Sequence, residues 1–313
     1  MRRRTLLTTA ATAGLLTATG LPAHATPPAR LPGFRHGYAT VGGVRLHYVE
    51  GGHGDPVVLL PGWPRTWWEF RKVMPALARQ RRVITVDLRG MGASAKPEAG
   101  YDKKTMAADI AALVTRLGHR RVDVVGSDIG AMVAFSMAAN HPDLVRTVTL
   151  LDVAHPEESW YEMTLLPEPG ETFHLWWFAF NQVRGLPEQL VAGRARALVD
   201  YLCELMLVNP DAVTDRDRAI FAAAYDTPDA IRAGNGWYQA FAQDIADDRG
   251  YAPVTPPLLA ITNPAQYDYL RDLLPRKAKS AEVVQVDGTG HYVVEERPED
   301  VLRLLAERLP QPS

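Results

Sequence analysis

The stretch VDVVGSDIGAMVAFSMAAN, residues 122–140, decides the fold and carries the first sign of chemistry. A short apolar strand over 122–125 runs into Gly126-Ser127-Asp128-Ile129-Gly130, and an apolar helix follows. Small residues at both ends let such a turn close, and its central residue projects into a site beside the backbone N–H of its neighbour. That residue is Asp128, and a carboxylate there predicts attack on an electrophilic carbon to give an ester bonded to the enzyme.

The same turn allows two other interpretations. A nucleophilic Ser127 would indicate an esterase, but it lies one place before the centre, so its side chain should point away from the apex. A glycine-rich turn with an incidental aspartate would carry no chemistry at all. The choice among the three therefore depends on the rest of the chain.

Composition excludes several classes of function. The chain has 313 residues, 47% of them hydrophobic, and a formal net charge of −2, so it is long enough for a large core. Without a basic excess, we expect no nucleic-acid partner. Cys203 is the one cysteine, so no intramolecular disulfide can form. No Cys/His cluster has zinc-like spacing, and we expect neither a metal nor another cofactor.

The N-terminus has the pattern of an export signal. Arg2-Arg3-Arg4 precede a Thr/Ala/Leu-rich apolar stretch that ends at Ala23-His24-Ala25. The start Arg3-Arg4-Thr5-Leu6-Leu7 is similar to a twin-arginine signal. A membrane anchor is the alternative, but the stretch is rich in Thr and Gly, and no later segment is long and apolar enough to span a bilayer. We predict that residues 1–25 are removed and that the exported protein then has no stable membrane association.

Strands and helices alternate between residues 38 and 153. This pattern predicts a mostly parallel central sheet with helices on both faces, because its strands are continuous apolar runs. The expected elements are a hairpin over 38–49, strands over 56–60, 82–88, 122–125 and 145–153, and helices over 65–80 and 104–117. Alternation resumes later with strands over 257–262 and 281–286 and a final helix from Glu299.

The intervening residues are helical, aromatic and charged, with no clear strand. We therefore divide the chain after the signal into a first part of an α/β core over 26–153, a helical cap over 154–255 and a second part of the core over 256–313. The cap is inserted after the sixth strand, at the carboxyl end where α/β sheets hold their sites. It should cover the pocket as a lid.

His291 is the candidate base. It follows the last strand in Gly288-Thr289-Gly290-His291, which gives the order nucleophile, acid, histidine along the chain. A neutral imidazole there could activate water against the enzyme ester. Two carboxylates could orient the histidine. Asp152 ends the strand over 145–153 and is favoured, while Asp268 is the first acid after the strand over 257–262.

The loop Pro61-Gly62-Trp63-Pro64 follows the strand over 56–60. The backbone N–H groups of Trp63 and Ile129 could both face the ester carbonyl oxygen and form an oxyanion hole. All seven tryptophans fall between residues 63 and 237, and together they predict a bulky apolar pocket. We expect Trp63, Trp176 and Trp237 to contact the substrate.

Six motifs make the chain similar to a known family over residues 35–310. They are PGWP (61–64), DLRGMGAS (87–94), GSDIGA (126–131), WWFAFNQVRGLPE (176–188), GNGWYQAF (234–241) and GTGHYVVEERPE (288–299). With these motifs the chain resembles the α/β-hydrolase fold family and, within it, the epoxide hydrolase and dehalogenase branch.

The resemblance implies a function. In epoxide hydrolases two cap tyrosines hold the epoxide oxygen, and GNGWYQAF places the second of them at Tyr238. The first position holds Trp177, whose indole N–H can donate a hydrogen bond but is a very poor acid. The resemblance thus implies that Asp128 attacks a hydrophobic small-molecule epoxide and that His291-activated water releases a vicinal diol.

Two other functions stay open. A dehalogenase uses the same aspartate and histidine; fluoroacetate-type members have arginines where this chain has Ile129 and Met132, and haloalkane-type members often have a tryptophan at the first of these places. Trp177 could still bind a halide. A non-catalytic binding protein or a cyclase with this fold is the second alternative.

Overall fold

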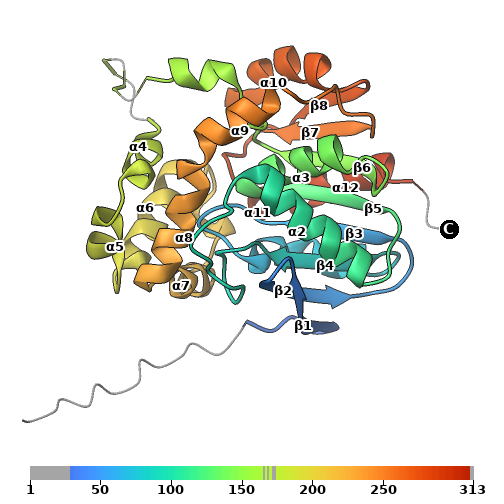
Figure 1. The fold of residues 1–313 in the computed structure, drawn as a ribbon, viewed down its shortest axis with the longest axis horizontal. Coiled ribbons are helices and arrows are strands. Elements are labelled where there is room, and N and C mark those ends of the chain that lie inside the picture. Colours follow the sequence, from blue (N-terminus) through green and yellow to red (C-terminus); the bar gives the residue numbers. More distant parts are fainter. Residues whose placement is uncertain (1–28, 165, 168, 171–173, 311–313) are drawn as a thin grey trace, which may run out of the picture.

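The computed structural model describes residues 29–164, 166–167, 169–170 and 174–310. The predicted export signal over residues 1–25 lies outside the described residues. Eight strands form one sheet in the order β1-β2-β4-β3-β5-β6-β7-β8 (Figure 1). Their bounds are Phe34–Val41 (β1), Val44–Gly51 (β2), Pro56–Leu60 (β3), Arg82–Asp87 (β4), Val122–Ser127 (β5), Val145–Leu151 (β6), Leu258–Thr262 (β7) and Ala281–Gln285 (β8).

The sheet is mostly parallel, as the alternation of strands and helices predicts. The hairpin β1–β2 and the pair β2–β4 are antiparallel, and all other neighbours run parallel. Strands β3, β5 and β7 are buried along their whole length, which explains their near-continuous apolar runs.

Helices lie on both faces of this sheet (Figure 1). They are α1 Met74–Leu77, α2 Lys103–Arg116, α3 Ile129–Asn140, α10 Pro264–Lys277, α11 Val293–Glu296 and α12 Pro298–Arg308. The α/β architecture expected from the sequence is thus confirmed.

One predicted helix is wrong. Residues 65–80 do not form a single helix but a 3₁₀ helix, η1 Trp67–Lys72, followed by the single turn of α1. Pro75 explains the break, because it has no N–H to donate to the carbonyl of Arg71 and its ring would clash with that carbonyl.

In the described part of the segment between β6 and β7, which we call the cap segment, helices joined by loops are the only regular elements. The cap segment contains η2 Glu158–Glu162, α4 Trp176–Gln182, α5 Leu186–Val191, α6 Ala195–Met206, η3 Pro210–Ala212, α7 Asp215–Ala224, α8 Pro228–Gln239 and α9 Phe241–Asp248. In Figure 1, α4 to α8 lie together at one end of the sheet. No helix among the described residues is both long and apolar enough to cross a membrane.

Buried polar contacts hold the cap segment on the core. Lys103 of α2 donates from Nζ to Asp244 of α9 at 2.7 Å and to the carbonyl of Trp237 at 2.7 Å, and both charged side chains are fully buried. Asp217 of α7 accepts from the indole N–H of Trp68 at 2.7 Å and from Arg71 at 2.8 Å. Losing one partner of such a pair would leave an uncompensated charge in the interior.

Candidate active site

The turn between β5 and α3 has the geometry of a nucleophile elbow. Asp128 joins the two elements with φ +50° and ψ −122°, a backbone conformation that is strained for any residue but glycine. A Cβ added at Gly126 would lie 2.1 Å from the carbonyl oxygen of Gly130, and one added at Gly130 would lie 1.9 Å from that of Leu60. Side chains at either glycine would therefore open the turn that presents Asp128.

Ser127 faces the other way. It is the last residue of β5, is 2% exposed and is not among the residues that line the cavity around Asp128. This orientation agrees with the register deduced from the two glycines and gives no support to a serine nucleophile.

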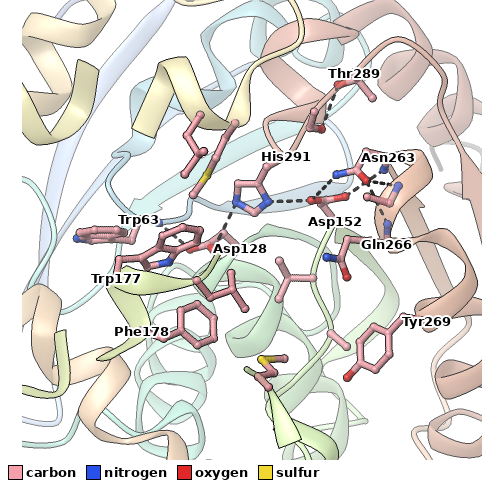
Figure 2. Close-up of a pocket in the computed structure, with 18 of the residues that line it drawn as sticks. Trp63, Asp128, Asp152, Trp177, Phe178, Asn263, Gln266, Tyr269, Thr289 and His291 are labelled. Carbon is pink, nitrogen blue, oxygen red and sulfur yellow. Dashed lines mark hydrogen bonds and ion pairs between the residues drawn. The ribbon is translucent and has the colours of Figure 1, made fainter. Parts of the chain in front are cut away.

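The structure brings Asp128, His291 and Asp152 into one line (Figure 2). The Nδ1 of His291 lies 2.8 Å from Oδ2 of Asp152, and its Nε2 lies 3.5 Å from Oδ2 of Asp128. Asp152 also accepts hydrogen bonds from the hydroxyl of Thr262 at 2.9 Å and from the backbone and side-chain N–H groups of Asn263, each at 3.0 Å. These donors fix the buried carboxylate that orients the imidazole.

Asp268, the alternative acid, is not brought to the site. It lies on α10 with a side chain that is 79% exposed, and it pairs with Arg271 at 2.7 Å. Asn263 explains the displacement, because its side chain caps α10 by accepting from the N–H groups of Ala265 and Gln266, so the helix begins before Asp268.

The two carboxylates change the protonation of His291. Burial alone would lower its pKa, but the hydrogen bonds and charges of Asp128 and Asp152 outweigh burial and raise the pKa to about 10. The imidazole is therefore protonated at neutral pH while Asp128 carries its charge. Loss of that charge removes one of the two groups that hold the proton.

This protonation predicts a dependence of stability on pH. The folded pKa of His291 lies above its value of about 6.5 in an unfolded chain, so its stabilising contribution is complete below pH ~6.5 and is lost as the pH rises through ~10. Over that window we expect the free energy of unfolding to fall by up to about 1.4 kcal/mol per pH unit from this group. Denaturant titrations should show a shallower decline for Asp128→Asn, and equal slopes would contradict the assignment.

Trp63 contacts Asp128 directly. Its backbone N–H donates to Oδ1 of Asp128 at 2.9 Å, and its peptide bond to Pro64 is cis. Ile129, the other predicted donor, is the first residue of α3 and is fully buried. Because Trp63 occupies Oδ1 of Asp128, Oδ2 is the oxygen left to face the cavity and His291.

Tyr238 and Trp177 lie on the cap side of the same cavity. They come from α8 and α4, are 1% and 5% exposed, and are joined by a hydrogen bond between their side chains. Burial, followed by the charge of Asp128, raises the pKa of Tyr238 well above its ordinary value. The phenol therefore keeps its proton and can act as a donor toward the cavity.

The cavity has a volume of about 410 Å³, within the range of small-molecule sites. Its wall is mainly apolar and includes Trp63, Met132, Trp160, Phe178, Leu205 and Met206. Gln266 and Tyr269 of α10 lie across it from Trp177 and Phe178 (Figure 2). Sequence reasoning missed Phe178, Gln266 and Tyr269; the aromatic run at 176–180 was the available signal for the first of them.

Two predicted substrate contacts are corrected. Trp237 is fully buried, and its indole N–H donates to the carbonyl of Arg89 at 3.0 Å, so it joins the cap segment to the core. Trp176 packs against Trp177, Phe180 and Tyr201. Neither tryptophan lines the cavity. Of the three tryptophans expected to contact the substrate, Trp63 alone does line it.

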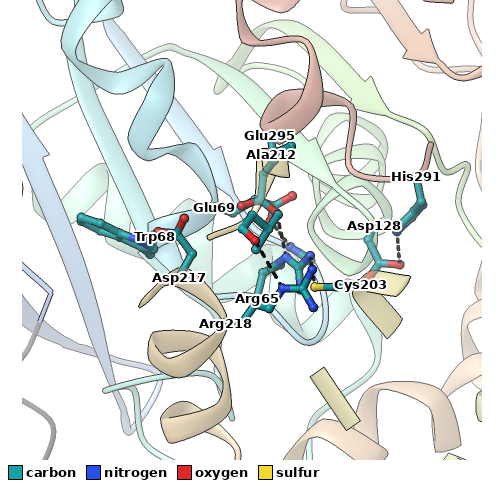
Figure 3. Close-up of polar contacts among 12 residues, drawn as sticks. Arg65, Trp68, Glu69, Asp128, Cys203, Ala212, Asp217, Arg218, His291 and Glu295 are labelled. Carbon is teal, nitrogen blue, oxygen red and sulfur yellow. Dashed lines mark hydrogen bonds and ion pairs between the residues drawn. The ribbon is translucent and has the colours of Figure 1, made fainter. Parts of the chain in front are cut away.

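A buried charged cluster lies beside the site, and sequence reasoning missed it (Figure 3). Arg65 is fully buried; its Nε donates to Glu295 at 2.8 Å, and its guanidinium stacks 3.7 Å from the ring centre of Tyr292. Glu295 also accepts from Arg71 at 2.5 Å. The cluster thereby ties the loop after Trp63 to the segment just after His291. Charged residues inside the aromatic run 65–72 were the available signal.

Glu69 belongs to the same cluster and holds the loop over 61–64. It is fully buried and accepts from the N–H of Gly62 at 2.8 Å. Burial, and then the charge of Glu295, raises the pKa of Glu69 to about 7, against hydrogen bonds from Ser127 and Gly62 and the charge of Arg65. Its carboxyl group therefore contacts the residues next to both Trp63 and Asp128.

Comparison with known proteins agrees with this geometry. Residues 55–199 match the model of the alpha/beta hydrolase fold family. The soluble epoxide hydrolase of Corynebacterium sp. (strain C12) is 34% identical over 277 residues, which cover 85% of this chain and 94% of that protein.

Solved structures are similar over nearly the whole chain. Cfl2 from Burkholderia cenocepacia is 34% identical with a TM-score of 0.82 over 89% of this chain and 96% of its own. The epoxide hydrolase CorEH is 31% identical with a TM-score of 0.76 over 88% of this chain and 98% of its own. The elbow, the covering helices and these likenesses together show that the chain belongs to the α/β-hydrolase fold family, in the branch of the epoxide hydrolases.

Proposed function

We propose that this protein is an epoxide hydrolase that converts an apolar epoxide to a vicinal diol through an ester on Asp128. The observation that carries the proposal is the arrangement around the cavity. A carboxylate at the elbow apex lies 3.5 Å from His291, and the buried donor pair of Tyr238 and Trp177 from the cap segment lines the same cavity.

In the first step Oδ2 of Asp128 attacks an epoxide carbon, and the carbon–oxygen bond of the ring breaks. Tyr238 gives its proton to the departing oxygen, which becomes a hydroxyl group. Trp177 donates a hydrogen bond to the phenol and so stabilises the phenolate that remains. The N–H of Trp63 holds Oδ1, which keeps the attacking oxygen turned toward the substrate.

In the second step the ester replaces the charge of Asp128, so the pKa of His291 falls and its Nε2 releases a proton, which passes through solvent to the phenolate of Tyr238. The neutral imidazole then takes a proton from water, and the hydroxide attacks the ester carbonyl carbon. The N–H groups of Trp63 and Ile129 stabilise the charge on Oδ1. Collapse breaks the ester bond, and the diol oxygen takes the proton from His291. The carboxylic acid left at Asp128 then returns its proton to the imidazole, which restores the resting charges of both groups.

The cavity favours an uncharged substrate. The charged residues that line it are Asp128, Asp152 and His291, and its remaining wall is apolar or neutral. Among the described residues, no arginine or lysine lines the cavity to meet a substrate carboxylate. Ile129 and Met132 stand where fluoroacetate-type dehalogenases have arginines. We therefore favour a neutral apolar epoxide over a haloacid. Because Trp177 could bind a halide, dehalogenation of a haloalkane is the second candidate function. Halide release from a panel of haloalkanes would reveal it.

Replacing Tyr238 by phenylalanine should slow formation of the ester by ~10²-fold, the scale for loss of one donor to a developing oxyanion. Hydrolysis of the ester should change far less, because Tyr238 lies on the cap side and is not a donor to Oδ1. Rapid-quench single-turnover kinetics separate the two steps. Tyr161→Phe, at a cap tyrosine that is 61% exposed, is the matched control. A larger effect on hydrolysis than on alkylation would remove Tyr238 from this role.

The decisive test of the function is a single turnover of styrene oxide in oxygen-18 water, followed by mass spectrometry of the peptide that contains Asp128. Label in the Asp128 carboxylate is expected, because water attacks its carbonyl carbon. Diol without label in that peptide would mean direct attack of water on the epoxide. A protein that forms no diol from a panel of neutral epoxides would contradict the proposal.

A further inference from the structure

The carboxylate of Glu296 joins the cap segment to the loop over 286–292, which carries His291 and which we call the histidine loop. Glu296 is the last residue of α11 and is 9% exposed. Its Oε1 accepts from the backbone N–H groups of Val208 at 2.8 Å and Asn209 at 2.6 Å, just beyond the C-terminal end of α6. Its Oε2 accepts from the N–H of Gly290 at 2.6 Å and the hydroxyl of Thr289 at 3.2 Å. The proposed mechanism makes no use of this group.

The same two segments also touch directly. The N–H of His291 donates to the carbonyl oxygen of Met206 at 3.1 Å. A Cβ at Gly290 would lie 2.0 Å from that oxygen, so only glycine permits the approach of the two backbones. Residues 205–208 line the cavity as well. The turn that contains Met206 therefore both lines the cavity and contacts the histidine loop.

We propose that Glu296 is a positioning residue that couples the cap turn over 206–209 to His291, so that the imidazole faces the ester when the cap turn is in place. The inference rests on the proposed function. Alkylation uses Asp128 and the donor pair on the cap, whereas hydrolysis of the ester needs Nε2 of His291. Release of the histidine loop from the cap turn should therefore slow the second step and spare the first.

The contacts of Glu296 call for a carboxylate. All four neighbouring groups are donors, two on each oxygen. A carboxylate accepts on both sides, but a glutamine amide has one acceptor, and its NH₂ group would face N–H groups on the other side. Glu296→Gln keeps the size of the side chain and satisfies only one of the two segments. Glu296→Asp keeps the charge but is one methylene too short to span both.

The experiment is single-turnover kinetics of styrene oxide hydrolysis with Glu296→Gln, Glu296→Asp and the wild type. Alkylation of Asp128 is expected within about threefold of wild type, and ester hydrolysis should be ~10–10²-fold slower, the scale for misplacing a catalytic group by about 1 Å. In the steady state kcat should fall while kcat/KM stays unchanged, and intact mass spectra should show the adduct. Glu299→Gln, at an exposed glutamate three residues further on, is the matched control.

Each other result contradicts the inference. Alkylation and hydrolysis that fall together, with fewer active sites per molecule, would mean that Glu296 has a structural role only. Rates equal to wild type in both variants would mean that the histidine loop is placed without it. If the Gln variant fails to fold, the Asp variant alone must show the split between the two steps. Wild-type protein that forms neither adduct nor diol would overturn the proposed function first, and the inference with it.

Discussion

Replacing Asp128 by asparagine is expected to lower diol formation by ~10⁴-fold or more. An amide oxygen is a far weaker nucleophile than a carboxylate, and loss of a nucleophile removes the covalent route as a whole. The elbow should survive, because asparagine tolerates a positive φ better than most residues and Asp128 has φ +50°. Initial rates of diol formation from styrene oxide measure the effect.

Asp268→Asn is the control for this change. The Asp268 side chain is 79% exposed and lies outside the site, so the variant should be as active as the wild type. A loss of activity there would reopen the assignment of the acid to Asp152. If the Asp128→Asn variant kept the biological activity of the protein, this result would instead favour a binding protein or a cyclase with this fold.

Replacing His291 by glutamine is expected to trap the ester. Alkylation needs no base, so Asp128 should still react, while hydrolysis loses its general base and slows by ~10²–10⁴-fold. Intact mass spectra taken after mixing with styrene oxide should show one added substrate per chain. His53→Gln, at an exposed residue in the loop between β2 and β3, serves as the control and should turn over normally.

If the His291→Gln variant formed neither the adduct nor the diol, this result would argue against two separate steps. In that case His291 would act before or during attack on the epoxide. The distance of 3.5 Å between its Nε2 and Oδ2 of Asp128 would then reflect a proton transfer in the first step. The spectra thus test the order of events as well as the identity of the base.

The sheet and the elbow that carries Asp128 could be predicted because both depend on local patterns. Continuous apolar runs indicate buried parallel strands, and two glycines around one residue indicate a tight elbow. The acid was harder, because Asp152 and Asp268 both follow strands. What separates them is the capping of α10 by Asn263, a contact that depends on where the helix begins.

The tryptophans show a second limit of the sequence. Adjacent residues on a helix point about 100° apart, so of two neighbours usually one alone can face a cavity. Trp177 and Tyr238 face it, and their neighbours Trp176 and Trp237 pack elsewhere. A sequence shows that one of each pair faces inward but does not reveal which, since both are aromatic.

The partners of the buried charges could not be predicted. Arg65 and Glu295 are 230 positions apart in the chain, and Glu296 reaches Val208 across 88 positions. Nothing in the local composition pairs such residues. Single charged residues in apolar surroundings were the available hint, and they did not reveal their partners.

The insertion of the cap segment between β6 and β7 also affects how the nascent chain folds. These strands are direct parallel neighbours, yet synthesis of β7 begins only after all of the cap segment has been made. At ~5–20 residues per second this leaves the edge of β6 unpaired for about 5–20 s. An open edge of this kind is a template for pairing with other chains. Helices of the cap segment that form early could shield it until β7 emerges from the ribosome.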